Sequence, residues 1–238
     1  MDRRTVREGV DRQARHLGER GDSRARNPST RVLSKKKTIF AKERDRPDVV
    51  ERRREYLERV KDISAARLVF VDETGTNVAM TPLYGRALVG ERAIGKAPRN
   101  QGTNLTVVGA VALDGIRCLM AYEGGTTREA FLRFVRDALV PSLHRGDVVV
   151  MDNLSSHYTD GVRQAIEGVG ATLMYLPPYS PELNPIEHTW SKLKALLRRA
   201  EARTLRTLAA AVSVSSSEIS KSDLSGWFSN CGYAAQCE

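Results

Sequence analysis

The chain has 238 residues, with 38 Lys and Arg against 29 Asp and Glu, which gives a formal net charge of +9 at pH 7. This size and a hydrophobic content of 41% fit a soluble globular protein with one substantial domain and an extension. Only three cysteines and no apolar run of about 18 residues exclude a disulfide scaffold and a membrane span. Without a secretory signal at its start, the chain is expected in the cytoplasm, and its positive charge favours an acidic partner, nucleic acid first.

The positive charge is concentrated at the front of the chain. Residues 1–60 hold 19 Lys and Arg and 11 Asp and Glu, a net +8, so the rest of the chain holds a net +1. Residues 1–34 are rich in Arg and lack aromatic residues, which predicts a largely disordered basic tail. Such a tail is compatible with a solvated segment and with a nucleic-acid-binding arm.

A basic linker over residues 35–64 is expected to contain a helix that begins at Pro47, because proline suits a first helical turn. Its loose apolar stripe comprises Val50, Tyr56, Leu57 and Val60.

Short apolar runs follow the linker and alternate with turns. Residues 67–71 and 104–113 predict buried strands, and Asp114-Gly115 predicts a hairpin that returns over residues 116–122. Further strands are expected at 147–151 and 171–176, and helices at 126–143, 160–168, 184–199 and 204–218. In the first of these helices the apolar face comprises Phe131, Phe134, Val135, Ala138 and Leu139.

The element order β-β-β-α-β-α-β-α predicts an α/β fold with a mixed five-stranded sheet and helices on both faces. We expect this α/β domain to span residues 65–205 and a C-terminal helical extension to span residues 206–238.

Two acids close two of the predicted strands, Asp72 after Leu-Val-Phe-Val and Asp152 after Val-Val-Val-Met. A charged side chain beside a core needs a partner or a metal, and the carboxyl ends of strands are where α/β sheets bind ligands. Either acid alone is more typical of an ordinary turn than of a catalytic site.

A proline-rich segment precedes the helix predicted at 184–199. The prolines at positions 177, 178, 181 and 185 stiffen the segment, Asn184 suits the helix cap, and Glu187 falls in the first turn. A rigid approach to one carboxylate favours a fixed metal ligand.

The same helix has two faces. Its apolar face contains Ile186, Trp190, Leu193 and Leu197, so Trp190 is expected in the core. Its polar face contains Glu187, Ser191, Lys194 and Arg198, and the two cations could be solvated or contact a DNA backbone.

Asp72, Asp152 and Glu187, with 34 residues between the last two, resemble the DDE triad of mariner-like transposases. The blocks FVDETG, VVVMDNLSSH and LPPYSPELNPIEHTW resemble the bacterial insertion-sequence-630 branch, over roughly residues 35–235. The resemblance implies an RNase H-like fold and a transposase catalytic half that cuts and rejoins DNA.

The resemblance also implies the chemistry of the three carboxylates. Gathered together they repel one another, and Mg²⁺ or Mn²⁺, two ions in the family's pattern, would relieve this. We expect Asp72 to bridge both metals, while Asp152 and Glu187 each bind one. Water would cleave at the element's ends, and the freed 3′-OH would attack target DNA, at a TA dinucleotide by analogy.

Supporting residues are also expected. Asn153 and His157 match the family's DN-x-x-x-H pattern, and His157 could orient a ligand, touch DNA or simply cap the core edge. Strand alternation directs Glu73 away from Asp72. Asn184 is expected to act as a helix cap rather than as a ligand.

The family's helix-turn-helix modules have no counterpart in residues 1–34, so a separately encoded DNA-reading part or a truncated copy is expected. The partners are then the element ends and target DNA, with a homodimer on DNA by analogy. Two alternatives remain: a non-catalytic DNA-binding remnant, and a nuclease that hydrolyses DNA without strand transfer.

Overall fold

The computed structural model describes residues 41–153 and 160–233. The predictions for the basic tail, for the start of the linker and for His157 lie outside these described residues. The chain divides into two units, Met1–Ile39 and Phe40–Glu238, and every described residue belongs to the second. No helix in the described part is both long enough and apolar enough to cross a membrane.

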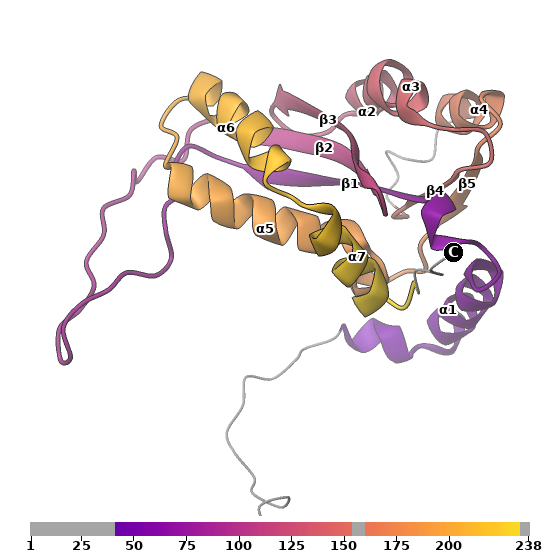
Figure 1. Cartoon of the computed structure of the whole chain (residues 1–238), viewed down its shortest axis with the longest axis horizontal. Coiled ribbons are helices and arrows are strands. Elements are labelled where there is room, and N and C mark those ends of the chain that lie inside the picture. Colours follow the sequence, from indigo (N-terminus) through magenta and orange to yellow (C-terminus); the bar gives the residue numbers. More distant parts are fainter. Residues whose placement is uncertain (1–40, 154–159, 234–238) are drawn as a thin grey trace, which may run out of the picture. The chain divides into compact units, whose positions relative to one another are not determined.

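A mixed five-stranded sheet forms the centre of the second unit, as the sequence predicts (Figure 1). The strand order is β3-β2-β1-β4-β5, so β1 lies in the middle. β1 pairs antiparallel with β2 and parallel with β4, while β2–β3 is antiparallel and β4–β5 parallel. The strands are β1 Leu68–Thr76, β2 Leu105–Ala112, β3 Gly115–Glu123, β4 Val148–Met151 and β5 Thr172–Tyr175.

Helices cover both faces of the sheet, which confirms the predicted architecture (Figure 1). One face, with Phe70 at its centre, packs against α5 Pro185–Ala200, α6 Leu205–Ser217 and α7 Lys221–Asn230. The other face, with Val69 and Val71, packs against α2 Arg128–Phe134, a π-helical segment Val135–Leu139, α3 Val140–Ser142 and α4 Asp160–Gly168. The sheet therefore lies between two apolar clusters.

Strand β1 is longer than predicted. The expected end was Asp72, but β1 continues to Thr76 because residues 73–76 keep pairing with β2. Pairing with β4 stops earlier, at Val71 opposite Met151. Asp72 is therefore the first residue of β1 that has no partner on β4. It still pairs with Gly109 of β2 on the other side.

Helix α1, Pro47–Val60, begins at the predicted proline, but the stripe that it buries differs from the prediction. Val49, Tyr56 and Val60 are buried, whereas Val50 and Leu57 are 53% and 46% exposed. The buried positions are spaced by seven and four residues, which places them on one helical face. The prediction for Val50 and Leu57 was wrong because each is one position further along the helix than a buried residue, Val49 or Tyr56, and therefore points away from the buried face.

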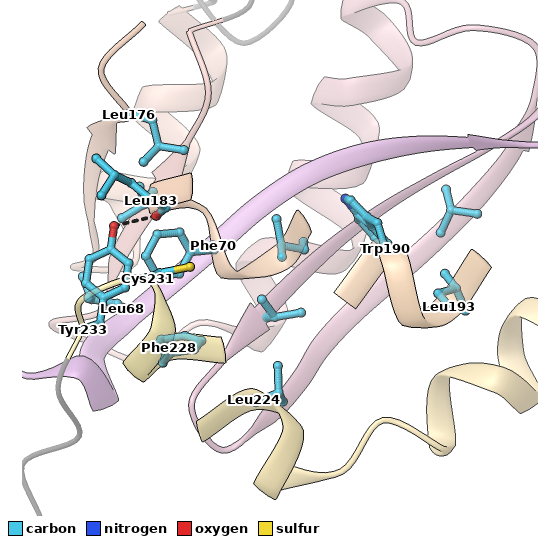
Figure 2. Packing of buried hydrophobic residues seen from close by; sticks show 14 of the residues in the cluster. Leu68, Phe70, Leu176, Leu183, Trp190, Leu193, Leu224, Phe228, Cys231 and Tyr233 are labelled. Atoms are coloured by element: carbon cyan, nitrogen blue, oxygen red, sulfur yellow. Dashed lines mark hydrogen bonds between the residues drawn. The ribbon is translucent and has the colours of Figure 1, made fainter. Parts of the chain in front are cut away.

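Tyr233, in the last described segment, lies between Phe228 of α7 and Leu183 of the proline-rich loop (Figure 2) and also contacts α1. Tyr56 donates to Tyr233 over 2.7 Å, and the Tyr233 hydroxyl donates over 2.6 Å to the carbonyl of Leu183. Phe70 contacts Phe228 and Tyr233, with ring centroids 5.4 and 4.9 Å apart. The sequence did not delimit α7, although its capping box of Ser220 and Asp223 is a recognisable signal. Residues outside the sheet thus complete the core beneath β1.

We expect Tyr233→Phe to lower the free energy of unfolding by about 1–3 kcal/mol, because it leaves the buried Leu183 carbonyl and the Tyr56 hydroxyl without this partner. Urea denaturation followed by circular dichroism measures the change. Tyr84→Phe is the matched control, since Tyr84 is 92% exposed. Equal stability of the two variants would contradict a structural role for this hydrogen-bonded chain.

Candidate active site

The three predicted acids line one cavity. The cavity has a volume of about 450 Å³ and is lined by Asp72, Asp152 and Glu187, together with Asn153, Asn184 and residues 176–181 of the proline-rich loop. The first and the last of these acids, Asp72 and Glu187, are 115 positions apart in the sequence, yet all three line the same cavity.

Each acid comes from a different element. Asp72 lies on the central strand, and Asp152 follows β4 at the next position of the same parallel register. Glu187 lies in the first turn of α5, where Pro185 begins the helix and the Glu187 N–H donates to the Asn184 carbonyl. The sheet and one helix terminus therefore fix the three backbone positions.

The proline-rich loop is held in place by the preceding basic segment. Arg53 of α1 donates to the Ser180 hydroxyl and, over 2.6 Å, to Glu182. Arg44 pairs with the same Glu182 oxygen at 3.2 Å. Sequence reasoning missed this contact because the two segments are more than 120 residues apart. Through it, α1 supports one wall of the cavity.

The carboxylate of Asp72 is buried and held by three donors. The Glu73 backbone N–H donates to Oδ1 over 2.8 Å, and Oδ2 accepts from Trp190 Nε1 at 3.3 Å and from Asn184 Nδ2 at 3.5 Å. Asn184 occupies the N-cap position of α5 as predicted, but its side chain makes no cap hydrogen bond and faces Asp72 instead. Trp190 is in the core as predicted, and its indole N–H also reaches the acid.

Burial, together with the negative charges of Glu187 and Asp152, raises the pKa of Asp72 to about 7. The Glu73 N–H and the Trp190 indole act in the opposite direction, because both stabilise the ionised form. Near neutral pH, without a cation, this carboxyl group is therefore protonated in a substantial fraction of the molecules.

The donor set of the cavity fits a hard divalent cation. Three carboxylates supply oxygen ligands of the kind that Mg²⁺ and Mn²⁺ prefer. The buried Asn184 Oδ1 is a further oxygen without a hydrogen-bond partner. Within residues 41–153 and 160–233, no three His, Cys, Asp or Glu side chains lie close enough together to hold a metal ion, so the three acids share the cavity without forming a preassembled ligand cluster.

Gly109 of β2 lies opposite Asp72 and makes room for Trp190. A Cβ at this position would lie 2.4 Å from Leu119 Cδ2 and 2.9 Å from Trp190 Cη2. We expect Gly109→Ala to cost about 1–3 kcal/mol through overpacking and to displace the indole from Asp72. Chemical denaturation and tryptophan fluorescence measure both effects, with Gly75→Ala as control because a Cβ there meets nothing within 4 Å. Unchanged fluorescence and stability would refute this packing constraint.

The other predicted residues lie in different surroundings. Asn153 lines the cavity and is exposed. Lys194 and Arg198 are half-buried further along α5 and do not line the cavity. Glu73 does not line the cavity either. Its negative charge contributes to the raised pKa of Tyr122, which packs against the apolar cluster that contains Val69 and Val71.

A mixed sheet with a buried acid on its central strand, and two more acids lining the same cavity, is the arrangement of an RNase H-like fold. The family model described as DDE superfamily endonuclease matches residues 67–209. This match covers more than half of the chain, which therefore belongs to the DDE superfamily endonucleases.

Solved structures of the mariner transposase Mos1 share this fold. The paired-end complex with the left transposon end has 17% sequence identity and a TM-score of 0.63, covering 96% of this chain and 67% of that one. The paired-end complex with Mn has 16% identity and a TM-score of 0.65, with coverages of 96% and 68%. The Mos1 catalytic domain with Raltegravir and Mg has 15% identity and a TM-score of 0.59, with coverages of 80% and 92%. No curated protein matches the chain in sequence.

Proposed function

We propose that this chain is the catalytic part of a DNA transposase of the insertion-sequence-630 branch. It would cleave DNA phosphodiesters and join the freed end to target DNA in cut-and-paste transposition, acting on bacterial DNA in the cytoplasm. The observation that carries the proposal is the single cavity shared by Asp72, Asp152 and Glu187 in a DDE endonuclease fold.

Asp72, as the central acid, would bridge two divalent ions, with Asp152 and Glu187 each holding one. When bound, the ions would activate the attacking water or 3′-OH and stabilise the leaving oxygen. Support comes from the oxygen-only donor set and from the Mos1 structures that contain Mn or Mg. Insertion at a TA dinucleotide is part of the same proposal, by analogy with the family.

DNA would reach the cavity past α1. A second hollow of about 190 Å³ adjoins the catalytic cavity and shares Asn153 and residues 176–178 with it. Arg52 and Arg59 of α1 line this hollow, with Glu55 between them. Two exposed guanidinium groups beside a carboxylate site favour contacts to the phosphates of an incoming strand.

We expect the double variant Arg52→Ala/Arg59→Ala to bind DNA more weakly and with a smaller salt dependence. Loss of two phosphate contacts should reduce the slope of log K against log [salt] by about 2. Fluorescence anisotropy at several salt concentrations measures the slope. Arg54→Ala is the matched control, because Arg54 pairs with Glu51 and does not line this hollow. Identical slopes for the two proteins would argue against this DNA path.

A homodimer on DNA is part of the proposal. The segment between β1 and β2, residues 77–104, forms a long loop beside the body in Figure 1. It exposes five large apolar side chains, those of Leu83, Tyr84, Leu88, Val89 and Ile94. Exposed apolar side chains in such number favour a protein contact. A separately encoded helix-turn-helix part would supply sequence-specific DNA reading.

The test is nicking of supercoiled plasmid with Mg²⁺ or Mn²⁺, comparing wild type with Asp152→Asn. Metal-dependent nicking that the variant lacks would support the catalytic proposal. A folded wild type that binds DNA without nicking it would favour the non-catalytic remnant. Nicking without joining of a pre-cleaved 3′-OH end to target DNA would favour a nuclease that only hydrolyses.

A further inference from the structure

Neither helix capping nor core packing explains the orientation of the Asn184 side chain. It is only 4% exposed, it lines the catalytic cavity, and its side chain makes no cap hydrogen bond to α5. Its Nδ2 faces Asp72 Oδ2 at 3.5 Å, while its Oδ1 is buried without a hydrogen-bond donor. A buried acceptor without a partner costs free energy, so its retention at a cavity wall indicates a ligand.

Trp190 complements Asn184 on the same acid. Its Nε1 lies 3.3 Å from the same Asp72 oxygen, and its ring is 3% exposed against the sheet at Gly109. Both donors are neutral, so they orient the carboxylate without neutralising its charge. The second oxygen of Asp72, Oδ1, accepts only the adjacent Glu73 N–H among the hydrogen bonds in the described part.

We propose that Asn184 and Trp190 are positioning residues of the divalent-cation site. The two N–H groups fix the orientation of Asp72, and the carbonyl oxygen of Asn184 offers a neutral fourth oxygen to the cation or to its bound water. This inference rests on the proposed function only in assuming that the cavity binds Mg²⁺ or Mn²⁺.

Helix α5 gives the arrangement its rigidity. Glu187 lies one helical turn before Trp190, and Asn184 immediately precedes the helix. One helix therefore carries an acid of the site and both groups that orient the acid on the sheet. A displacement of α5 would move Glu187 and release Asp72 together.

Binding of Mn²⁺ to the purified full chain without DNA tests the inference, measured by calorimetry and by loss of the free Mn²⁺ electron paramagnetic resonance signal. We expect Trp190→Phe and Asn184→Leu each to weaken Mn²⁺ binding by about 10-fold or more, as loss of groups supporting a metal ligand does. Trp227→Phe and Asn230→Ala are the matched controls, because neither residue lines the cavity. If Asn184→Leu does not fold, Asn184→Ser serves, since it also removes the Nδ2 donor.

A double-mutant cycle with Asp72→Asn separates the two roles. In that background Trp190→Phe should have no further effect, because it acts only through Asp72, whereas Asn184→Leu should still weaken the residual binding through loss of Oδ1. Wild-type Mn²⁺ affinity in folded Trp190→Phe and Asn184→Leu, or no Mn²⁺ binding by the wild type, would overturn the inference. Mn²⁺ binding without plasmid nicking would reject the proposed function alone.

Discussion

Asp72→Asn should abolish metal-dependent DNA nicking and, at the same time, stabilise the metal-free protein at pH 8. Activity is lost because the amide cannot serve as a bridging anionic ligand. Stability is gained because the variant no longer ionises a carboxyl group that is buried beside Glu187 and Asp152.

The sign follows from the two pKa values of Asp72, about 7 in the folded protein and near its usual 3.8 when unfolded. As pH rises from about 4 to about 7, the unfolded chain releases this proton before the folded protein does. The free energy of unfolding therefore falls over that range, by at most about 4 kcal/mol, and stays low above it. Asp72→Asn removes this dependence.

Urea denaturation in EDTA at pH 4, 5, 6, 7 and 8 measures the difference between wild type and Asp72→Asn. The difference should grow with pH up to about 7 and then level off. Asp114→Asn is the control, because the Asp114 side chain is 60% exposed and its loss should leave the pH profile unchanged. A variant less stable than wild type at pH 8 would contradict this account of the site.

A divalent cation should stabilise the wild type strongly at pH 8 and very little at pH 5. At a Mn²⁺ concentration about 100 times the Kd measured at pH 8, the gain should be about 3 kcal/mol. At pH 5 the cation must displace a proton from Asp72, which weakens binding by about 100-fold and leaves less than about 0.5 kcal/mol.

Thermal unfolding with and without Mn²⁺ at both pH values measures this dependence. Asp152→Asn and Glu187→Gln should each lose most of the gain at pH 8, because each lacks one of the proposed ligands. Ca²⁺ and Mg²⁺ series would show whether the preference is for small ions. An equal gain at both pH values would place the cation away from Asp72.

Local sequence patterns correctly predicted the features that depend on a few neighbouring residues, namely a turn, a helix start and a strand end. The Asp114-Gly115 turn produced the β2–β3 hairpin, and Pro185 began α5 with Glu187 in its first turn. Asp152 follows its strand as predicted, since the apolar run before it fills the buried strand β4.

The missed features depend on contacts between distant segments. Asp72 lies inside β1 because β2 continues past the end of β4, which the sequence of β1 does not encode. Asn184 has the residue type and position of a helix cap, and only its proximity to Asp72 gives it another partner. The support that Arg53 gives to the proline-rich loop likewise requires the folded arrangement.

The residues that match the family model, 67–209, do not include all the residues that build the core on the Phe70 face of the sheet. A fragment limited to residues 67–209 would lack Tyr56 below the proline-rich loop and Phe228 and Tyr233 beside Phe70. Its central strand would carry Asp72, the proposed catalytic acid, over an uncovered apolar surface. A piece that keeps these contacts with the core and the proline-rich loop therefore has to extend from about Arg44 to Tyr233.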